Sequence, residues 1–180
     1  LALAREVLKT FDRNVKFREL KKDGQKVKKG DTIVFLKGKA RSILSCERVA
    51  LNFLSYLSGI SSQTHEAAQK VSSKGIQILD TRKTTPLFRT LEKYAVFMGG
   101  GRNHRFDLSE QYLVKDNHLF ILKKTGGLAA LADREPKVPF EIEAENIQDL
   151  KKALAYCPDI IMLDNFNPQE IKKAIAIIHH

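Results

Sequence analysis

Cysteine is scarce in this chain of 180 residues, which holds only Cys46 and Cys157. The two lie far apart and show no Cys-x-x-Cys spacing, so the sequence predicts neither a disulfide framework nor a zinc site. Sparse, unpaired cysteines are typical of proteins in a reducing compartment. We therefore expect the protein in the cytoplasm.

Long apolar runs are also missing. No stretch approaches the roughly 18 apolar residues that a membrane-spanning helix needs. The opening residues, LALAREVLKTF, carry charges inside their apolar pattern, which is not typical of a signal peptide. Apolar residues make up 43% of the chain and charged residues 29%, so the composition predicts a soluble globular protein with a sizeable core.

Acidic residues are outnumbered by basic ones, and the formal net charge is +10. A solvated basic surface accounts for many of the lysines. Two more specific interpretations are a nucleic-acid-binding surface and a site for a small polyanionic substrate. Aromatic residues make up only 8% of the chain and lie in apolar patterns, which disfavours a nonenzymatic nucleic-acid-binding protein but leaves it as an alternative.

Short elements open the chain. Residues 3–11 fit an amphipathic helix, and residues 15–20 fit a half-buried strand because apolar and charged residues alternate there. Turns containing Gly24 and Gly30 separate a short strand expected around Val27 from another at residues 32–36. The opening segment is therefore predicted to be small, basic and rich in strands.

Residues 43–72 change character, because their apolar residues recur at helical spacing. Gly59 is the expected break or cap of this helical stretch. A domain boundary is expected near residues 38–45.

The sequence pattern changes again at residue 75, where short apolar runs begin to alternate with stretches of helical spacing. Strands are expected at residues 76–80, 111–116, 139–146 and 159–165, and helices after each, one of them around residues 119–132. This alternation is typical of parallel βα units and predicts the α/β class. Each expected strand begins apolar and ends in charged residues, and a βα barrel keeps its active site at that end of its strands.

These strand ends combine cations with carboxylates. The cations are Arg82, Lys83, His104, Arg105 and Lys115, and the carboxylates are Glu141 or Glu143, with Asp164. Arginine binds carboxylates and phosphates bidentately. Paired acids suit a divalent metal ion or a developing positive charge. The pattern therefore predicts an anionic substrate and a metal-bound phosphate.

The motifs also resemble one protein family, in that family's order and across essentially the whole chain. They read ERVALNFLSYLSGI (47–60), LDTRKT (79–84), EKYAVFMGGGRNHR (92–105), VKDNH (114–118), EIEAEN (141–146) and MLDN (162–165). They resemble the quinolinate phosphoribosyltransferases, pentosyltransferases that make nicotinate mononucleotide, pyrophosphate and CO2 from quinolinate and phosphoribosyl pyrophosphate during NAD biosynthesis. LDTRKT followed by GGGxNHR is the specific part of the resemblance.

The resemblance implies a fold and an assembly. Residues 1–42 would be part of an N-terminal α/β sandwich domain, residues 43–74 connecting helices, and residues 75–180 the first part of an incomplete parallel α/β barrel. The family's sequences continue through further strands and loops that bind the 5-phosphate, so we expect the chain to be incomplete at both ends. A homodimer or higher oligomer with a shared active site is expected.

The resemblance also implies residue roles. Quinolinate binding would fall to Arg48, Arg82, His104, Arg105 and Lys115, with Arg48 reaching the site of the neighbouring subunit. Phosphoribosyl pyrophosphate binding would fall to Lys83, Lys115, Glu143 and Asp164. Lys83, Glu143 and Asp164 would be catalytic, and Glu143 and Asp164 would hold Mg²⁺, directly or indirectly.

Plainer interpretations stay open for several of these residues. Arg48 can be a surface helix residue, His104 a loop histidine with ordinary partners, and Gly99–Gly101 a flexible loop rather than an anion-binding nest. The acids Glu141, Glu143 and Glu145 share one strand face and can form a solvated edge strand. A related phosphoribosyltransferase acting on nicotinate or another ring is the nearest alternative function.

Overall fold

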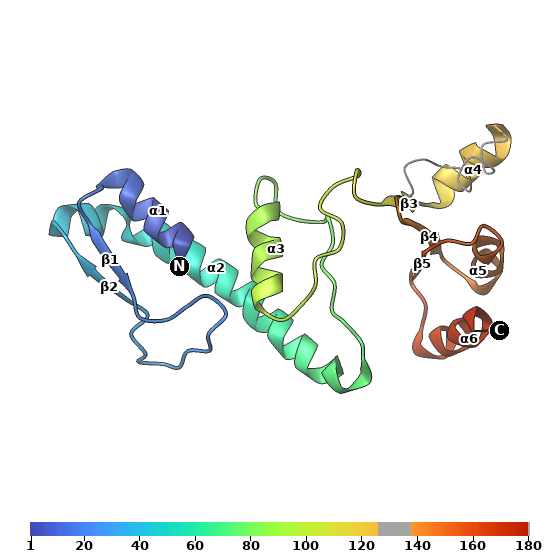
Figure 1. The fold of residues 1–180 in the computed structure, drawn as a ribbon, viewed down its shortest axis with the longest axis horizontal. Coiled ribbons are helices and arrows are strands. Elements are labelled where there is room, and N and C mark those ends of the chain that lie inside the picture. Colours follow the sequence, from blue (N-terminus) through green and yellow to red (C-terminus); the bar gives the residue numbers. More distant parts are fainter. Residues whose placement is uncertain (126–137, 180) are drawn as a thin grey trace. The chain divides into compact units, whose positions relative to one another are not determined.

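The computed structural model describes residues 1–125 and 138–179 of the chain. It forms two compact units, Leu1–His104 and Arg105–His180 (Figure 1). The domain division expected at residues 42 and 74 stays a prediction. None of the described helices is long and apolar enough to cross a membrane.

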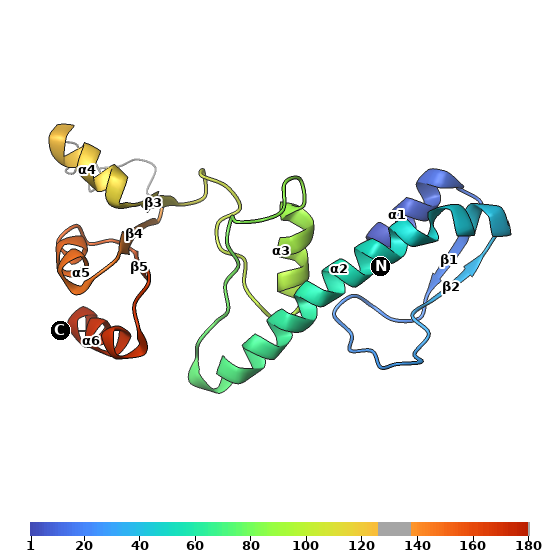
Figure 2. The same ribbon diagram turned by 180° about the vertical axis from the view of Figure 1, so that it is seen from behind.

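The first unit opens with a helix packed against a small antiparallel sheet. Helix α1 (Ala2–Phe11) precedes strands β1 (Lys16–Glu19) and β2 (Val34–Lys37), as expected. Leu8, Val15 and Cys46 are buried together where α1 meets the following helix. In Figures 1 and 2, α1 runs alongside that helix.

The strand expected around Val27 is wrong. Two turns, closed by Gln25 N–H to the Lys22 carbonyl and by Asp31 N–H to the Lys28 carbonyl, flank this residue. Because these turns follow one another so closely, too few extended residues lie between them to form a ladder with a neighbouring strand.

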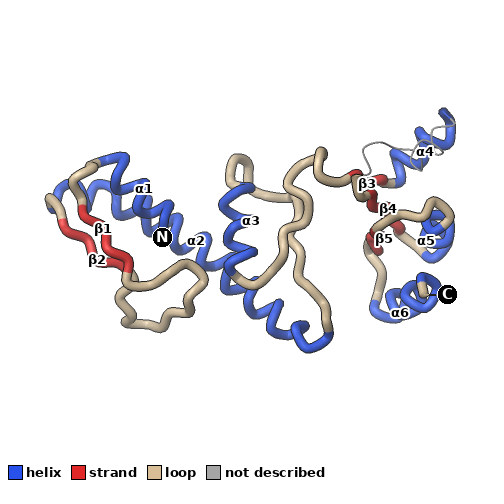
Figure 3. The backbone as a smooth tube through the Cα atoms, in the orientation of Figure 1, coloured by secondary structure: helices blue, strands red, loops and turns tan. Residues whose placement is uncertain are grey.

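Helix α2 (Ala40–Val71) has 32 residues and continues through Gly59, so the expected break there is wrong. Figure 3 shows it as one unbroken helix. A single glycine costs a helix only about 1 kcal/mol relative to alanine. The packing of α2 against α1 and against α3 (Arg89–Met98) outweighs that cost.

We expect Gly59→Ala to raise the free energy of unfolding by about 0.5–1 kcal/mol, because alanine is the better helix former. A Cβ atom added at Gly59 meets no other atom within 4 Å. Urea unfolding of the variant measures the effect. The matched control is Gly99→Ala, whose Cβ would lie 2.7 Å from Thr64 Cβ and should destabilise the protein. A destabilised Gly59→Ala variant would contradict the prediction.

The strand expected at residues 76–80 is reduced to one isolated parallel bridge, Leu79 with Arg102. Asp80 N–H donates to the Arg102 carbonyl at 3.1 Å, and Arg102 N–H donates to the Ile78 carbonyl at 2.8 Å. Residues 78–80 thus run parallel to the chain at Arg102. Because the chain has just left the Gly99–Gly101 turn there, the two segments pair at one position and do not form a longer ladder.

The glycine turn itself is tightly packed. A Cβ added at Gly99 or Gly101 would lie 2.7 Å from Thr64 Cβ or from Val96 Cγ1 respectively. Gly99 and Gly101 therefore allow the end of α3 to approach Thr64 of α2 closely. This packing argues against a plain flexible loop.

The second unit alternates strands and helices, as predicted. In chain order it contains β3 (Tyr112–Val114), α4 (Asp116–Thr125), β4 (Phe140–Ala144), α5 (Ile147–Leu154), β5 (Ile160–Leu163) and α6 (Pro168–Ile178). The strands form a parallel sheet in the order β3-β4-β5. The part of the helix expected at residues 126–132 lies outside the described residues.

Strand β4 is the buried centre of this sheet. Phe140 and Ile142 are fully buried in it, and Leu150 of α5 is fully buried beside it. Because β4 lies between two strands and all five of its residues are buried, its acids do not form a solvated edge strand. That interpretation is wrong.

Candidate active site

A buried ion pair joins the two motif loops of the first unit, residues 79–84 and residues 99–104. Lys93 Nζ lies 2.5 Å from Asp80 Oδ1, and the side chains of Lys93 and Asp80 are only 3% and 7% exposed. Lys93 also donates to the His104 carbonyl at 2.8 Å, and His104 N–H donates to Asp80 at 2.9 Å. The backbone at His104 is thereby fixed to the residue that precedes the Thr81–Thr85 segment.

A second contact holds the other end of that segment. Thr85 N–H donates to the Glu92 carboxylate at 3.3 Å, and Tyr56 Oη donates to the same group at 2.6 Å. Although burial alone would raise the pKa of Glu92, the hydrogen bonds from Tyr56 and Thr85 hold it below the usual range. Glu92 therefore stays ionised and keeps accepting both bonds at neutral pH.

Arg82 and Lys83 lie on the segment between these two contacts. Among the described residues, Arg82 Nε is the one buried side-chain nitrogen or oxygen without a hydrogen-bond partner. Lys83 is exposed and lines a cavity of about 360 Å³ with Tyr56 and Ile60 of α2 and with Glu92 and Lys93 of α3. The segment thus carries two cations, Arg82 with an unsatisfied donor and Lys83 on the wall of an open cavity.

Arg48 is exposed on α2, eight residues before Tyr56. At 1.5 Å per residue it lies about 12 Å along the helix from the part of α2 that lines the Lys83 cavity. The structure therefore does not bring Arg48 to Lys83 within this chain.

The second unit contains the acids. The carboxylate oxygens of Glu143, Glu145 and Asp164 all lie within 4.8 Å of one another. The parallel register explains this proximity, since Asp164 N–H donates to the Ala144 carbonyl at 3.0 Å as the chain leaves β5. Three carboxylates so close together suit a hard divalent cation such as Mg²⁺.

Lys115 completes this group from the end of β3. Its Nζ lies 2.5 Å from Glu143 Oε2, and the hydrogen bond to Glu143 raises the pKa of Lys115. Burial opposes that rise, while the negative charges of Glu143 and Asp164 add to it. Lys115 is therefore a cation at any physiological pH.

The acids Glu141 and Glu143 of β4, and Glu145 just after it, have different surroundings. Glu141 is buried and accepts a hydrogen bond from Gln111 Nε2 at 2.8 Å, so it belongs to the interior of the sheet. Arg105 donates from Nη1 to the Gln111 carbonyl at 2.8 Å. Glu143 and Glu145, not Glu141, are the acids beside Asp164.

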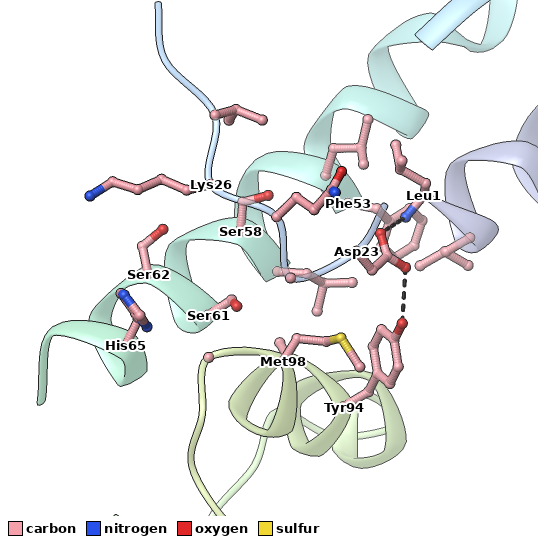
Figure 4. Close-up of a pocket in the computed structure, with 18 of the residues that line it drawn as sticks. Leu1, Asp23, Lys26, Phe53, Ser58, Ser61, Ser62, His65, Tyr94 and Met98 are labelled. Carbon is pink, nitrogen blue, oxygen red and sulfur yellow. Dashed lines mark hydrogen bonds and ion pairs between the residues drawn. The ribbon is translucent and has the colours of Figure 1, made fainter. Parts of the chain in front are cut away.

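A second cavity in the first unit, of about 410 Å³, contains none of the predicted site residues. It lies among the start of α1, the loop at residues 23–27, α2 and α3 (Figure 4). Tyr94 Oη donates to Asp23 at 3.0 Å on its wall. Its lining includes Asp23, Lys26, His65 and Glu66, so this cavity too carries charged groups.

Sequence reasoning missed Lys93 and Glu92, although both stand in a motif that had been singled out. A signal was present: Lys93 lies three residues before Val96 on a helix, so that a lysine falls on the same side as an apolar residue. A buried lysine needs an acid partner. The nearest such acid before Lys93 that follows an apolar run, residues 76–79, is Asp80.

Two family models match the chain. Residues 1–58 match the quinolinate phosphoribosyl transferase N-terminal domain, and residues 60–180 match the C-terminal domain of the same family. The second match alone covers more than half of the chain.

Curated relatives agree with this match. A probable nicotinate-nucleotide pyrophosphorylase [carboxylating] of Methanocaldococcus jannaschii is 43% identical over 91% of this chain and 58% of the relative. One from Bacillus subtilis, of the same name, is 42% identical over 95% of this chain and 60% of the relative. The chain thus spans about three fifths of the length of these relatives.

Solved structures show the same similarity. NadC from Streptococcus pyogenes has a TM-score of 0.89 and 42% identity, covering 99% of this chain and 64% of that one. A nicotinate-nucleotide pyrophosphorylase from Ehrlichia chaffeensis has a TM-score of 0.91 and 37% identity, covering 99% of this chain and 65% of that one. These values confirm the predicted incomplete α/β fold.

Proposed function

Since the chain belongs to the quinolinate phosphoribosyl transferase family, we propose that the protein transfers phosphoribosyl from phosphoribosyl pyrophosphate to quinolinate. The reaction includes decarboxylation and yields nicotinate mononucleotide, pyrophosphate and CO2 for NAD biosynthesis. The observation that carries the proposal is the segment with Arg82 and Lys83, which is fixed at one end by Asp80 bound to Lys93 and at the other by Thr85 bound to Glu92. Two cations held in this way suit an anionic substrate.

Quinolinate carries two carboxylates, and the motifs supply several cations that can bind them. In this proposal Arg82, His104, Arg105 and Lys115 bind these carboxylates. Arg48 of a neighbouring subunit adds a further guanidinium. Arginine and carboxylate form paired, charge-assisted hydrogen bonds, so these residues fix the ring in one orientation.

The reaction begins when the pyridine nitrogen forms a bond to the anomeric carbon and the bond to pyrophosphate breaks. Positive charge develops on the ribose, and Glu143 and Asp164 stabilise it. Lys83 and Lys115 bind the phosphate oxygens. The ring nitrogen is then formally positive, so the electron pair left on the ring carbon when CO2 departs is stabilised. That carbon then takes up a proton from water, which gives nicotinate mononucleotide.

A divalent cation fits the acids of the second unit. Glu143, Glu145 and Asp164 would hold Mg²⁺, because they bring three hard oxygen ligands within 4.8 Å of one another. Bound there, Mg²⁺ would supply positive charge against the oxygens of the pyrophosphate. Glu145 joins Glu143 and Asp164, which were the acids predicted for this role.

The oligomer and the compartment are also part of the proposal. A homodimer or higher oligomer is supported by Arg48, which is exposed and does not line the Lys83 cavity of its own chain. Cys46 and Cys157 are both free thiols, which supports a reducing cytoplasm.

Binding of quinolinate and of nicotinate separates this function from its nearest alternative. We expect quinolinate to bind at least about 10-fold more tightly, because one charge-assisted contact to the second carboxylate contributes roughly 1.5–3 kcal/mol. Calorimetry on the full-length protein gives both affinities. Equal affinities would favour an enzyme that acts on nicotinate. DNA binding that weakens with salt, without any quinolinate binding, would favour the nucleic-acid alternative.

We expect Asp164→Asn to lower turnover and to shift the Mg²⁺ concentration needed for half-maximal rate. The substitution removes one of three carboxylates but keeps the size of the side chain. Quinolinate affinity should stay within a factor of about two to three, because the loop cations are unchanged. Initial rates over a Mg²⁺ series, with calorimetry for quinolinate, measure both effects. A variant that loses only quinolinate affinity would show that Asp164 binds quinolinate and not phosphoribosyl pyrophosphate.

A further inference from the structure

Lys93 is almost completely buried, yet its partners come from both motif loops of the first unit. Its Nζ contacts Asp80, which precedes Arg82 by two residues, and the carbonyl of His104. At 3% exposure the side chain of Lys93 has almost no surface to offer a substrate, although it forms part of the wall of the Lys83 cavity. Any role that Lys93 has in binding must therefore act through the loops that it joins.

The network around this pair is closed. Asp80 Oδ1 accepts from Lys93 and from His104 N–H, at 2.5 and 2.9 Å. With its amide oriented to satisfy its neighbours, Asn103 donates to Asp80 Oδ2 at 2.8 Å and to the Lys93 carbonyl at 3.0 Å. Each carboxylate oxygen thus has a donor, and residues 103 and 104 are attached to Asp80 by side-chain and backbone bonds.

Stability alone is a weak explanation for this arrangement. Removing two charges from water costs several kcal/mol for each ion, and apolar replacements of buried pairs are often neutral or stabilising. What an ion pair adds over an apolar contact is direction, because its hydrogen bonds specify one relative position of the groups that they join. The pair is therefore suited to setting loop geometry.

The neighbouring residue of α3 reinforces that interpretation. Glu92 accepts from Thr85 N–H, while Lys93 binds Asp80, so consecutive residues of one helix hold both ends of the segment that carries Arg82 and Lys83. A segment of five residues fixed at both ends has little freedom to move its cations. Misplacement of a binding group by about 1 Å can cost roughly 100-fold in rate.

We propose that Lys93 and Asp80 form a positioning pair that sets the relative placement of Arg82 and His104 for binding of the dicarboxylate. The inference rests on the proposed function, since the dicarboxylate is its substrate. The pair contacts no substrate itself. Its removal weakens binding even where the fold keeps its stability.

The test uses the full-length protein in three forms: wild type, Lys93→Met, and the double variant Asp80→Asn with Lys93→Met. The single variant leaves Asp80 charged, buried and unpaired, so it loses stability. The double variant leaves no buried charge and regains much of that stability. Tyr94→Phe is the matched control, because it removes a 3.0 Å bond to Asp23 from the next residue of the same helix.

Urea unfolding and calorimetry with quinolinate separate positioning from stability. We expect the double variant to approach wild-type stability while its quinolinate affinity stays about 10- to 100-fold lower, as is usual when a residue that orients a binding group is lost. Tyr94→Phe keeps wild-type affinity. Steady-state rates should show the loss mainly in KM for quinolinate.

Affinity within about threefold of wild type in the stable double variant would overturn the proposal. If the uncharged variants aggregate, Lys93→Arg replaces them in the test. Arginine keeps the charge, but its larger head group should displace the His104 carbonyl. An unchanged quinolinate affinity in this variant would also overturn the proposal. If wild type binds no quinolinate, the proposed function fails and this inference fails with it. That outcome is recognisable because it does not depend on residue 93.

Discussion

Replacing Arg82 by methionine should weaken quinolinate binding by at least about 10- to 100-fold while leaving the unliganded protein as stable as wild type or more stable. The loss of affinity follows from charge-assisted hydrogen bonds to a carboxylate, worth roughly 1.5–3 kcal/mol each. The stability follows from the buried Nε, which has no partner among the described residues. A buried donor without a partner costs about 1–3 kcal/mol, and methionine removes it.

Calorimetry with quinolinate and urea unfolding without ligand measure the two effects on one preparation. Arg102→Met is the matched control, because Arg102 is an exposed arginine on the neighbouring motif loop, where its backbone forms the bridge to Leu79. Its replacement should change neither quantity much. An Arg82→Met variant that is clearly destabilised yet still binds quinolinate normally would show that Arg82 is a structural residue.

Mixing inactive Arg48→Ala and Lys83→Ala subunits should restore up to about half of the wild-type activity per dimer. Lys83 lines its own chain's cavity, whereas Arg48 is exposed on α2 about 12 Å away along the helix from the residues that line it. If Arg48 acts in the partner's site, a mixed dimer combines both lesions in one site and leaves the other intact. The complementation is geometric and needs no new contact.

The measurement is turnover before and after the two full-length variants are dissociated, mixed and reassociated. Mass spectrometry of the intact dimers gives the mixed fraction independently of activity. Each variant treated alone in the same way is the control and should stay inactive. Complete exchange without any recovered activity would assign Arg48 to its own chain or to no site.

Local periodicity predicted most of the elements correctly. Helix α1, strands β1 and β2 and the parallel βα units follow from apolar spacing within each segment, which depends little on distant residues. The error at Val27 is local, because the turns on either side of this residue leave too few extended residues for a strand. The errors at Gly59 and residues 76–80 depend on whether a distant segment packs against the chain or pairs with it, and the sequence around these residues does not contain that information.

The site was predicted less completely than the fold. The contact between Lys115 and Glu143 joins two residues that the motifs had named, but the motifs left Glu141, Glu143 and Glu145 equivalent. Their partners separate Glu141 from Glu143, because Glu141 accepts a hydrogen bond from Gln111 inside the sheet whereas Glu143 accepts one from Lys115. Lys93 was missed for the opposite reason: lysine is almost always a surface residue, so its burial becomes evident only with Asp80 and His104 in place.

Release of pyrophosphate and CO2 by the full-length protein tests the central claim most directly. Supplied with phosphoribosyl pyrophosphate, Mg²⁺ and quinolinate labelled in the 2-carboxylate, the protein should release pyrophosphate and labelled CO2 in equal amounts, at a rate that depends on quinolinate. Nicotinate should support neither release. Pyrophosphate release with nicotinate and none with quinolinate, or no release with either, would contradict the account.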